Sequence, residues 1–274
     1  MKITFYGTRG SISVSGKEYV EFGGNTSCVL MEFGNGRIGI LDAGTGLRQL
    51  GSDIIKRRIR QEDGIFIALS HTHWDHIQGF PFFKPAYDPT RKFTIAISGK
   101  GRKGTSLETL FEAQMQQDFF PAPLDAMGAS MTFWEPTASE IAGPYGARVN
   151  ALQHNHPGGA YSYRFEEGGK VLVYCTDVEH GDDIDPNIVQ IASNADLLIH
   201  DAQYKTEELA EKKGWGHSSW NQAAEVAKRA GVKKLALFHH DPERTDQMLR
   251  EMEAECQQTF PQSFFAREGI DVEL

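Results

Sequence analysis

The chain has 274 residues, of which 40% are hydrophobic and 24% are charged, as in ordinary globular proteins. Its net charge of −9 disfavours long nucleic acid as the main partner, because phosphate binding requires a positive surface. A bound metal would still attract a small anionic substrate. The sequence shows no apolar run of membrane-spanning length and no signal peptide, and its three cysteines, Cys28, Cys175 and Cys256, are scattered. We therefore expect a cytoplasmic protein with reduced cysteines and no membrane association.

The first third of the chain alternates short strands with glycine-rich loops. Residues 2–6 form a predicted strand, and the loop after it carries Arg9, which either contacts an anionic substrate or is a solvated loop arginine. Two further strands are predicted on either side of a tight turn at Asn35-Gly36. The second of them ends at Asp42, which we expect to orient a metal-binding histidine or to begin a helix or turn.

Four side chains of metal-ligand type follow the next predicted strand, residues 64–70. In the sequence H-T-H-W-D-H, His71, His73, Asp75 and His76 lie within six residues. Imidazole and carboxylate groups suit zinc, iron or manganese. His71 and His73 point the same way if the segment is extended, and Asp75 and His76 reach a second, adjacent point if the chain then turns into a helix. The motif therefore predicts ligands for two neighbouring metals.

Two helices and an aromatic stretch complete this half of the chain. A helix is predicted over residues 47–60, and the basic residues near its C-terminus, which the helix dipole favours, are interpreted as a solvated face. The aromatic, proline-rich stretch 79–87 either forms a wall of the metal site or belongs to the core or to an oligomer contact. A second helix is predicted over residues 104–119, with Pro121 ending it.

In the second half of the chain, strand after strand ends in histidine or aspartate. The predicted strands and the residues that follow them are 148–152 with His154 and His156, 170–176 with Asp177, 196–199 with His200 and Asp201, and 234–238 with His239 and His240. Because the C-terminal ends of parallel strands lie at one edge of a sheet, these side chains can converge. Only one of His154 and His156 need bind a metal. Strands alternating with helices predict an α/β sandwich with outer helices, built as one domain over residues 1–274.

At these residues the chain resembles the metallo-β-lactamase-fold hydrolases, and it is most similar to the branch that contains ribonuclease Z and cyclic-nucleotide phosphodiesterases. The resemblance covers nearly the whole chain. Its further matches are Asp42 after a strand, the histidine before Pro157-Gly158-Gly159, the strand with Tyr163-Arg164, Asp177 after a strand, the helix-opening turn Gly216-His217-Ser218, and the L-x-L-x-H strand that ends at His239.

The resemblance implies a four-layer αβ/βα sandwich and two divalent metal ions, with zinc first and manganese or iron as alternatives. The implied ligands are His71, His73 and His156 for the first metal, Asp75, His76 and His239 for the second, and Asp177 as the bridge between them. When the family motifs are matched to this sequence, His156 is preferred to His154, and His239 is preferred to His240.

The predicted activity is hydrolysis of a phosphodiester in a small nucleotide, a cyclic nucleotide being one candidate. Asp75 would orient the attacking water, and His217 would act near the scissile phosphate as a hydrogen-bond or proton donor. The alternatives are hydrolysis of lactone, thioester or β-lactam carbonyls, and a nuclease like ribonuclease Z. A non-catalytic binding module is disfavoured because the implied ligand set is complete.

Two further expectations concern partners. Ribonuclease Z proper carries a tRNA-gripping arm between its Tyr-Arg strand and its bridging aspartate. Here a single Gly-Gly turn follows Arg164 on the way to Asp177, which disfavours tRNA processing. Relatives are often homodimers, so a homodimer is an option for this chain as well.

Overall fold

The computed structural model describes residues 1–59, 64–99, 101–138 and 140–274. In this part of the chain the strands form two seven-stranded sheets. The first sheet contains β1 (Lys2–Gly7), β2 (Cys28–Glu32), β3 (Ile38–Leu41), β4 (Ile65–Ala68), β5 (Lys92–Ala96), β6 (Ser130–Trp134) and β14 (Asp271–Glu273). The second sheet contains β7 (Glu140–Ala142), β8 (Arg148–His154), β9 (Ala160–Glu167), β10 (Lys170–Cys175), β11 (Leu197–Asp201), β12 (Leu235–Phe238) and β13 (Ser263–Phe265).

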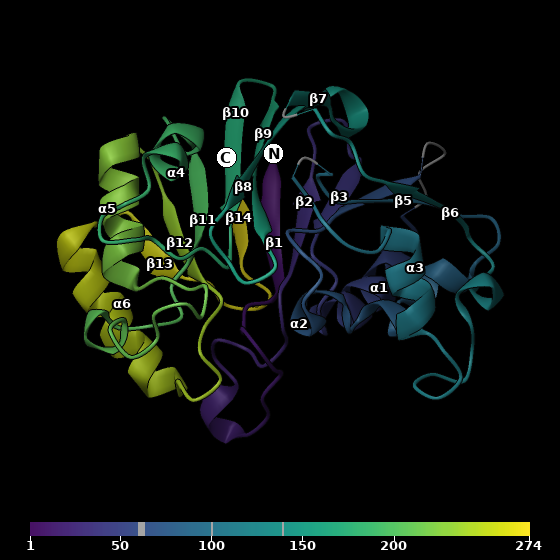
Figure 1. Cartoon of the computed structure of the whole chain (residues 1–274), viewed down its shortest axis with the longest axis horizontal. Helices are drawn as coiled ribbons and strands as arrows, with labels where there is room; N and C mark the ends of the chain where they lie inside the picture. The colour runs from purple at the N-terminus through teal and green to yellow at the C-terminus, as the bar shows by residue number, and fades with distance from the viewer. Residues whose placement is uncertain (60–63, 100, 139) are drawn as a thin grey trace.

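Helices lie outside both sheets (Figure 1). On the side of the first sheet these are α1 (Gly46–Lys56), α2 (Trp74–Ile77) and α3 (Leu107–Gln114), and on the side of the second sheet α4 (Pro186–Ile191), α5 (Trp220–Ala230) and α6 (Asp246–Thr259). Short 3-10 turns are η1 (Lys17–Tyr19), η2 (Phe80–Phe82), η3 (Lys84–Tyr87), η4 (Leu124–Met127), η5 (Pro144–Gly146) and η6 (Thr206–Glu208). The α/β class and the four-layer αβ/βα sandwich predicted from the sequence are confirmed.

The larger hydrophobic core lies between the two sheets. Phe5 of β1 and Phe238 of β12 are fully buried there, with their ring centroids 6.1 Å apart. A second core packs the outer face of the second sheet against its helices, with Leu198 of β11 and Val226 of α5 as members. Because each strand buries a defined apolar face, its register is fixed. The residues that follow each strand are therefore held in place as well.

Strand direction brings the chemically important residues to one edge of each sheet. In the order β14-β1-β2-β3-β4-β5-β6, strands β3 to β6 run parallel to one another, whereas β3 pairs antiparallel with β2. In the order β13-β12-β11-β10-β9-β8-β7, the strands from β10 to β13 are parallel. β8 runs in the same direction as β10, because both pair antiparallel with β9. The C-terminal ends of β3, β4, β8, β10, β11 and β12 can therefore contribute to one site.

Two helices are shorter than the sequence predicted. The predicted helix 47–60 corresponds to α1, which ends at Lys56, and Arg58 beyond it has a positive φ of 54°. Arg60, at the predicted end, lies outside the described residues. Lys56 and Arg58 are exposed, as expected for a solvated basic face. The predicted helix 104–119 corresponds to α3, and its expected end near Pro121 is wrong because Met115 already leaves the helical conformation, at φ −105° and ψ 19°.

The aromatic stretch 79–87 is divided between core and surface. Phe80 and Phe83 are buried. The Phe80 ring lies 4.5 Å from that of Phe111 on α3, and the Phe83 ring lies 5.4 Å from that of Phe93 on β5. Phe82 is exposed. Two of the three phenylalanines are thus core residues, one of the alternatives that the sequence left open.

Arg9 corrects both interpretations made from the sequence. Its side chain is fully buried, so it is neither a solvated loop arginine nor open to a substrate. Nε donates to the carbonyl oxygen of Gly23 at 2.8 Å, Nη1 donates to that of Arg244 at 2.6 Å, and Nη2 lies 3.9 Å from the Asp246 carboxylate. Arg9 therefore ties the N-terminal loops to the segment before α6.

Arg9→Ala should lower the free energy of unfolding by about 3–5 kcal/mol, because it leaves buried carbonyls and a carboxylate without their cation. Chemical denaturation would measure the loss. Arg48→Ala is the matched control, since Arg48 is exposed on α1 and such surface changes usually stay within about 0.5 kcal/mol. Equal stability of the two variants would contradict a structural role for Arg9.

The three cysteines are buried and unpaired. Among the described residues, the helices lack the combination of length and apolar character that a membrane span requires.

Candidate metal centre

The ends of parallel strands position the site. Asp42 follows β3, Asp177 follows β10 and His239 follows β12. All three have a positive φ, of 58°, 55° and 60°. This left-handed conformation is uncommon for residues other than glycine, and it clusters at functional sites where the surrounding structure enforces it. The backbone turns sharply at each strand end and projects these side chains towards one another.

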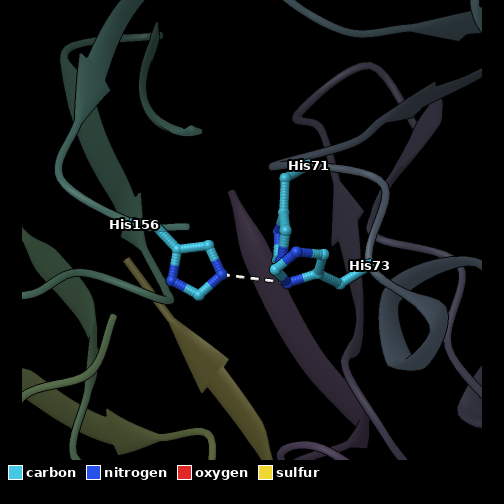
Figure 2. A group of neighbouring side chains, drawn as sticks. All are labelled: His71, His73 and His156. Atoms are coloured by element: carbon cyan, nitrogen blue, oxygen red, sulfur yellow. Dashed lines mark hydrogen bonds between the residues drawn. The ribbon is translucent and has the colours of Figure 1, made fainter. Parts of the chain in front are cut away.

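The first group of candidate ligands consists of His71, His73 and His156 (Figure 2). His71 and His73 lie in the segment that connects β4 to α2. The backbone is still extended at His73, the residue before the helix, with φ −63° and ψ 155°. Their ring centroids are 4.5 Å apart. His156 approaches from the turn after β8, and its Nε2 lies 3.0 Å from His73 Nδ1. One nitrogen from each of the three rings lies within 4.8 Å of the others.

The second group consists of Asp75, His76 and His239, together with Asp177. Asp75 and His76 lie on the short helix α2. The chain therefore turns into a helix after His73, the condition under which the sequence predicted that these two residues reach a second point. Asp75 Oδ2 is 3.3 Å from His76 Nε2 and 3.2 Å from His239 Nε2. All four residues are buried, so their ligand atoms face one small volume.

The Asp177 carboxylate lies between the two groups. Its Oδ1 is 3.7 Å from His71 Nε2 and 3.8 Å from His156 Nε2 in the first group. The same oxygen is 3.3 Å from His239 Nε2, and Oδ2 is 3.2 Å from His76 Nε2, in the second group. This is the position that a shared ligand would need.

Protein hydrogen bonds hold the far nitrogen of several of these imidazoles. His76 Nδ1 donates to the Asp42 carboxylate at 2.8 Å. His156 Nδ1 donates to the carbonyl oxygen of Gly216 at 2.9 Å, and His239 Nδ1 donates to the side-chain oxygen of Gln203 at 2.8 Å. Such bonds fix the ring orientation and the tautomer, which leaves Nε2 with a lone pair for a metal. The expectation that Asp42 orients a histidine is met by its contact with His76.

The donor set fits divalent cations. His71 Nε2 is buried and has no hydrogen-bond partner among the described residues, as expected of a ligand atom. Burial lowers the pKa of His71, His73 and His156, so their rings are neutral near pH 7 and able to bind metal. Asp42, Asp75 and Asp177 concentrate negative charge in the same buried volume, which a cation would neutralise.

His217 lies beside both groups. Its ring centroid is 5.4 Å from that of His156 and 4.9 Å from that of His239. Nδ1 donates to the Asp201 carboxylate at 2.9 Å. Burial opposes a charge on this ring, but Asp201 outweighs burial and raises the pKa of His217 to about 9. Nδ1 also lies 3.9 Å from Asp177 Oδ1, and one nitrogen of His217 lies within 4.8 Å of possible ligand atoms of His156 and Asp177.

In each of the pairs His154/His156 and His239/His240, one histidine lies outside both groups of candidate ligands. His154 donates from Nε2 to the backbone carbonyl of Asp177 at 3.0 Å, and His240 donates from Nε2 to that of Ala266 at 2.8 Å. Burial lowers the pKa of His154 to about 4 and that of His240 to about 3. Both are therefore neutral core histidines, and His156 and His239 face the site.

Asp201 and Gln203 also take part in the site. The sequence placed Asp201 among the strand-end residues that can converge but gave it no specific role, and it did not single out Gln203. Asp201 accepts hydrogen bonds from His217, from the Ser218 backbone at 2.8 Å and from the Asp177 backbone at 3.1 Å. Its place at the end of β11 is the same signal that marks Asp42 and Asp177. Gln203 lies in the following loop and carries no comparable signal.

Gly10 provides a test of the close packing around His239. A Cβ atom at this position would lie 2.2 Å from His239 Nδ1, so Gly10→Ala should displace the ring and break its bond to Gln203. We expect zinc affinity to fall about 10- to 100-fold, the effect of losing a partner that orients a metal ligand. Competition with a chelator would measure it. Gly181→Ala is the control, because a Cβ there meets nothing within 4 Å, and equal affinities would contradict the prediction.

Comparisons with known proteins identify several chains similar to this one. A relative named ribonuclease Z from Leuconostoc mesenteroides is 23% identical over 265 residues, which cover 78% of this chain and 81% of the relative. Ribonuclease Z from Gemmatimonas aurantiaca is 41% identical over 83 residues, but this match spans 30% of the chain and only 26% of that relative. The solved structure of the metallo-β-lactamase fold protein YhfI from Bacillus subtilis superposes with a TM-score of 0.73 at 20% identity, covering 100% of this chain and 98% of that one.

The family model described as the Beta-lactamase superfamily domain matches residues 39–240. This range includes Asp42, the H-T-H-W-D-H motif and His239. The chain therefore belongs to the metallo-β-lactamase superfamily and has the fold of its hydrolases.

Proposed function

We propose that the chain is a phosphodiesterase that binds two divalent metal ions and hydrolyses small nucleotides, including cyclic ones. The observation that supports it most is the position of Asp177 between two groups of candidate ligands, 3.2–3.8 Å from a nitrogen of four histidines. Imidazole and carboxylate ligands suit zinc, with manganese and iron as alternatives.

The proposed ligands follow the two groups. His71, His73 and His156 would hold the first ion, Asp75, His76 and His239 the second, and Asp177 both. Bound divalent ions supply Lewis acidity, which lowers the pKa of water and neutralises charge on phosphoryl oxygens.

Two side chains of the protein would handle protons and orientation. Asp75 accepts a hydrogen bond from the Ser11 backbone through Oδ2 at 2.8 Å, so this carboxylate is fixed and can orient the attacking water. Asp201 fixes the His217 ring through Nδ1. Nε2 of His217 makes no hydrogen bond within the described ranges, and it is proposed to donate to a phosphoryl oxygen or to the leaving alkoxide.

A nuclease like ribonuclease Z is the second candidate, because relatives that cover most of the chain carry that name. Two observations disfavour a long RNA substrate. Strands β9 and β10 form a hairpin that pairs Glu167 directly with Lys170, so no arm is inserted there. The net charge of −9 also opposes binding of a long polyanion.

The test is a substrate screen with the metal-loaded protein. We expect turnover of bis(p-nitrophenyl) phosphate and of a cyclic mononucleotide or dinucleotide. Turnover of thioester or lactam substrates without any phosphodiester turnover would identify a carbonyl hydrolase instead. Cleavage of a precursor tRNA in preference to small nucleotides would favour the nuclease.

A further inference from the structure

The metal centre opens to solvent at His73. Of the three histidines in the first group, His71 and His156 are buried, whereas His73 is exposed. The next residue, Trp74, is the first residue of α2, and 58% of its surface is exposed. An exposed indole is therefore attached to the backbone between two candidate ligands, His73 and Asp75.

A second exposed indole belongs to the segment that contacts His156 and contains His217. Trp215 is 59% exposed and precedes Gly216, whose carbonyl accepts the hydrogen bond from His156. A series of side-chain contacts also connects Trp215 to His217. Lys212 Nζ lies 4.4 Å from the centroid of the Trp215 ring and 5.9 Å from that of Tyr204, and the Tyr204 ring lies 5.7 Å from that of His217.

The backbone on both sides of Trp215 is fixed although its side chain is exposed. The Glu179 carboxylate accepts hydrogen bonds from the amides of Gly214 and Gly216, each at 2.8 Å. Trp74 is fixed by the first turn of α2, in which the His76 amide donates to the His73 carbonyl at 3.0 Å. A ligand that contacts these rings would therefore order little additional backbone, which favours binding.

Scattered exposed apolar residues are normal on protein surfaces, so exposure alone carries no weight. The distribution of tryptophan is more informative. Of the four tryptophans, Trp220 is buried and Trp134 is half-buried, and the two exposed ones lie within two residues of His73 and His217, respectively. Exposed indole faces beside a phosphate-binding centre match the way in which proteins stack nucleobases, a contact that tolerates any base.

We propose that Trp74 and Trp215 are stacking platforms for the base of a nucleotide whose phosphate occupies the metal centre. Lys212 covers one face of Trp215, so the base would stack on the opposite face. This inference rests on the proposed function and specifies its substrate class, namely phosphodiesters that carry a nucleobase.

The test compares adenosine 5′-monophosphate with ribose 5-phosphate, which share a 5-phosphorylated ribose and differ at C1, where the first carries adenine and the second a hydroxyl group. Calorimetry on the metal-loaded protein should show tighter binding of adenosine 5′-monophosphate. In the double variant Trp74→Ala/Trp215→Ala this affinity should fall about 5- to 100-fold, the range that loss of base–aromatic stacking produces. The affinity for ribose 5-phosphate should be unchanged.

Two controls separate stacking from general damage. Trp74→Phe/Trp215→Phe keeps aromatic faces and should retain most of the preference for the base. Phe119→Ala removes an aromatic ring that is exposed in the loop beyond α3 and should have no effect. Equal binding of the two ligands by the wild type, or a preference that survives in the double alanine variant, would overturn the proposal. Failure of the proposed function is distinguishable, because the wild type would then not turn over bis(p-nitrophenyl) phosphate.

Discussion

Asp177→Asn should reduce phosphodiester turnover by about 1,000-fold or more, because one carboxylate serves both groups of candidate ligands. Asparagine has nearly the same shape and tolerates the positive φ of 55° at this position, so the fold should survive. The metal content of the purified variant should also fall. Steady-state kinetics and elemental analysis on the same preparation would measure both effects.

The matched control is Asp196→Asn, at the opposite end of β11 from the metal centre. The Asp196 carboxylate accepts from the Val171 amide and from Lys233 Nζ, each at 2.8 Å. It is thus a hydrogen-bonded aspartate of the same sheet without a place in the site. Its substitution should leave turnover and metal content unchanged. If Asp177→Asn behaved like this control, the shared-ligand role of Asp177 would be wrong.

Asp42→Ala should lower both stability and metal affinity. The carboxylate is fully buried and accepts four hydrogen bonds, from the Ser70 amide at 2.7 Å, the Ser70 hydroxyl at 2.8 Å, the Tyr174 hydroxyl at 2.7 Å and His76 Nδ1 at 2.8 Å. Its removal leaves buried donors without an acceptor, for which we expect a loss of about 3–5 kcal/mol in the free energy of unfolding. Zinc affinity should fall about 10- to 100-fold, as for other residues that orient a ligand histidine.

The variant Asp42→Asn separates the loss of stability from the loss of metal affinity. It retains one carbonyl acceptor and tolerates the positive φ, so it should unfold at a higher denaturant concentration than Asp42→Ala. Metal affinity should still fall, because the amide cannot orient His76 as the carboxylate does. A variant with unchanged zinc affinity would show that Asp42 supports the fold only and not the metal centre.

The sequence predicts the strand-end part of this site well, for a physical reason. A buried strand is recognisable as a short apolar run, and in a parallel sheet the residue after it must lie at the common edge. This rule alone locates His71 and Asp177, and it places His239 and His240 together at the end of the last of these strands. The resemblance to a known family was needed to choose His156 over His154 and His239 over His240, because the two histidines of each pair lie at the end of the same strand.

Other features depend on contacts that no local pattern encodes. Arg9 lies in a loop that looks solvated, yet backbone carbonyls from residues more than 200 positions away enclose it. Gln203 meets His239 only because the loops after β11 and β12 are adjacent in the folded chain. The length of α3 was overestimated because its apolar spacing continues beyond Met115, where the chain has already turned.

The most direct test of the dinuclear centre is anomalous X-ray diffraction from crystals of the zinc-loaded protein, recorded at the zinc absorption edge. We expect two zinc peaks per chain, one beside His71, His73 and His156 and one beside Asp75, His76 and His239, with the Asp177 carboxylate between them. A single peak, or zinc bound away from these side chains, would contradict a dinuclear hydrolase.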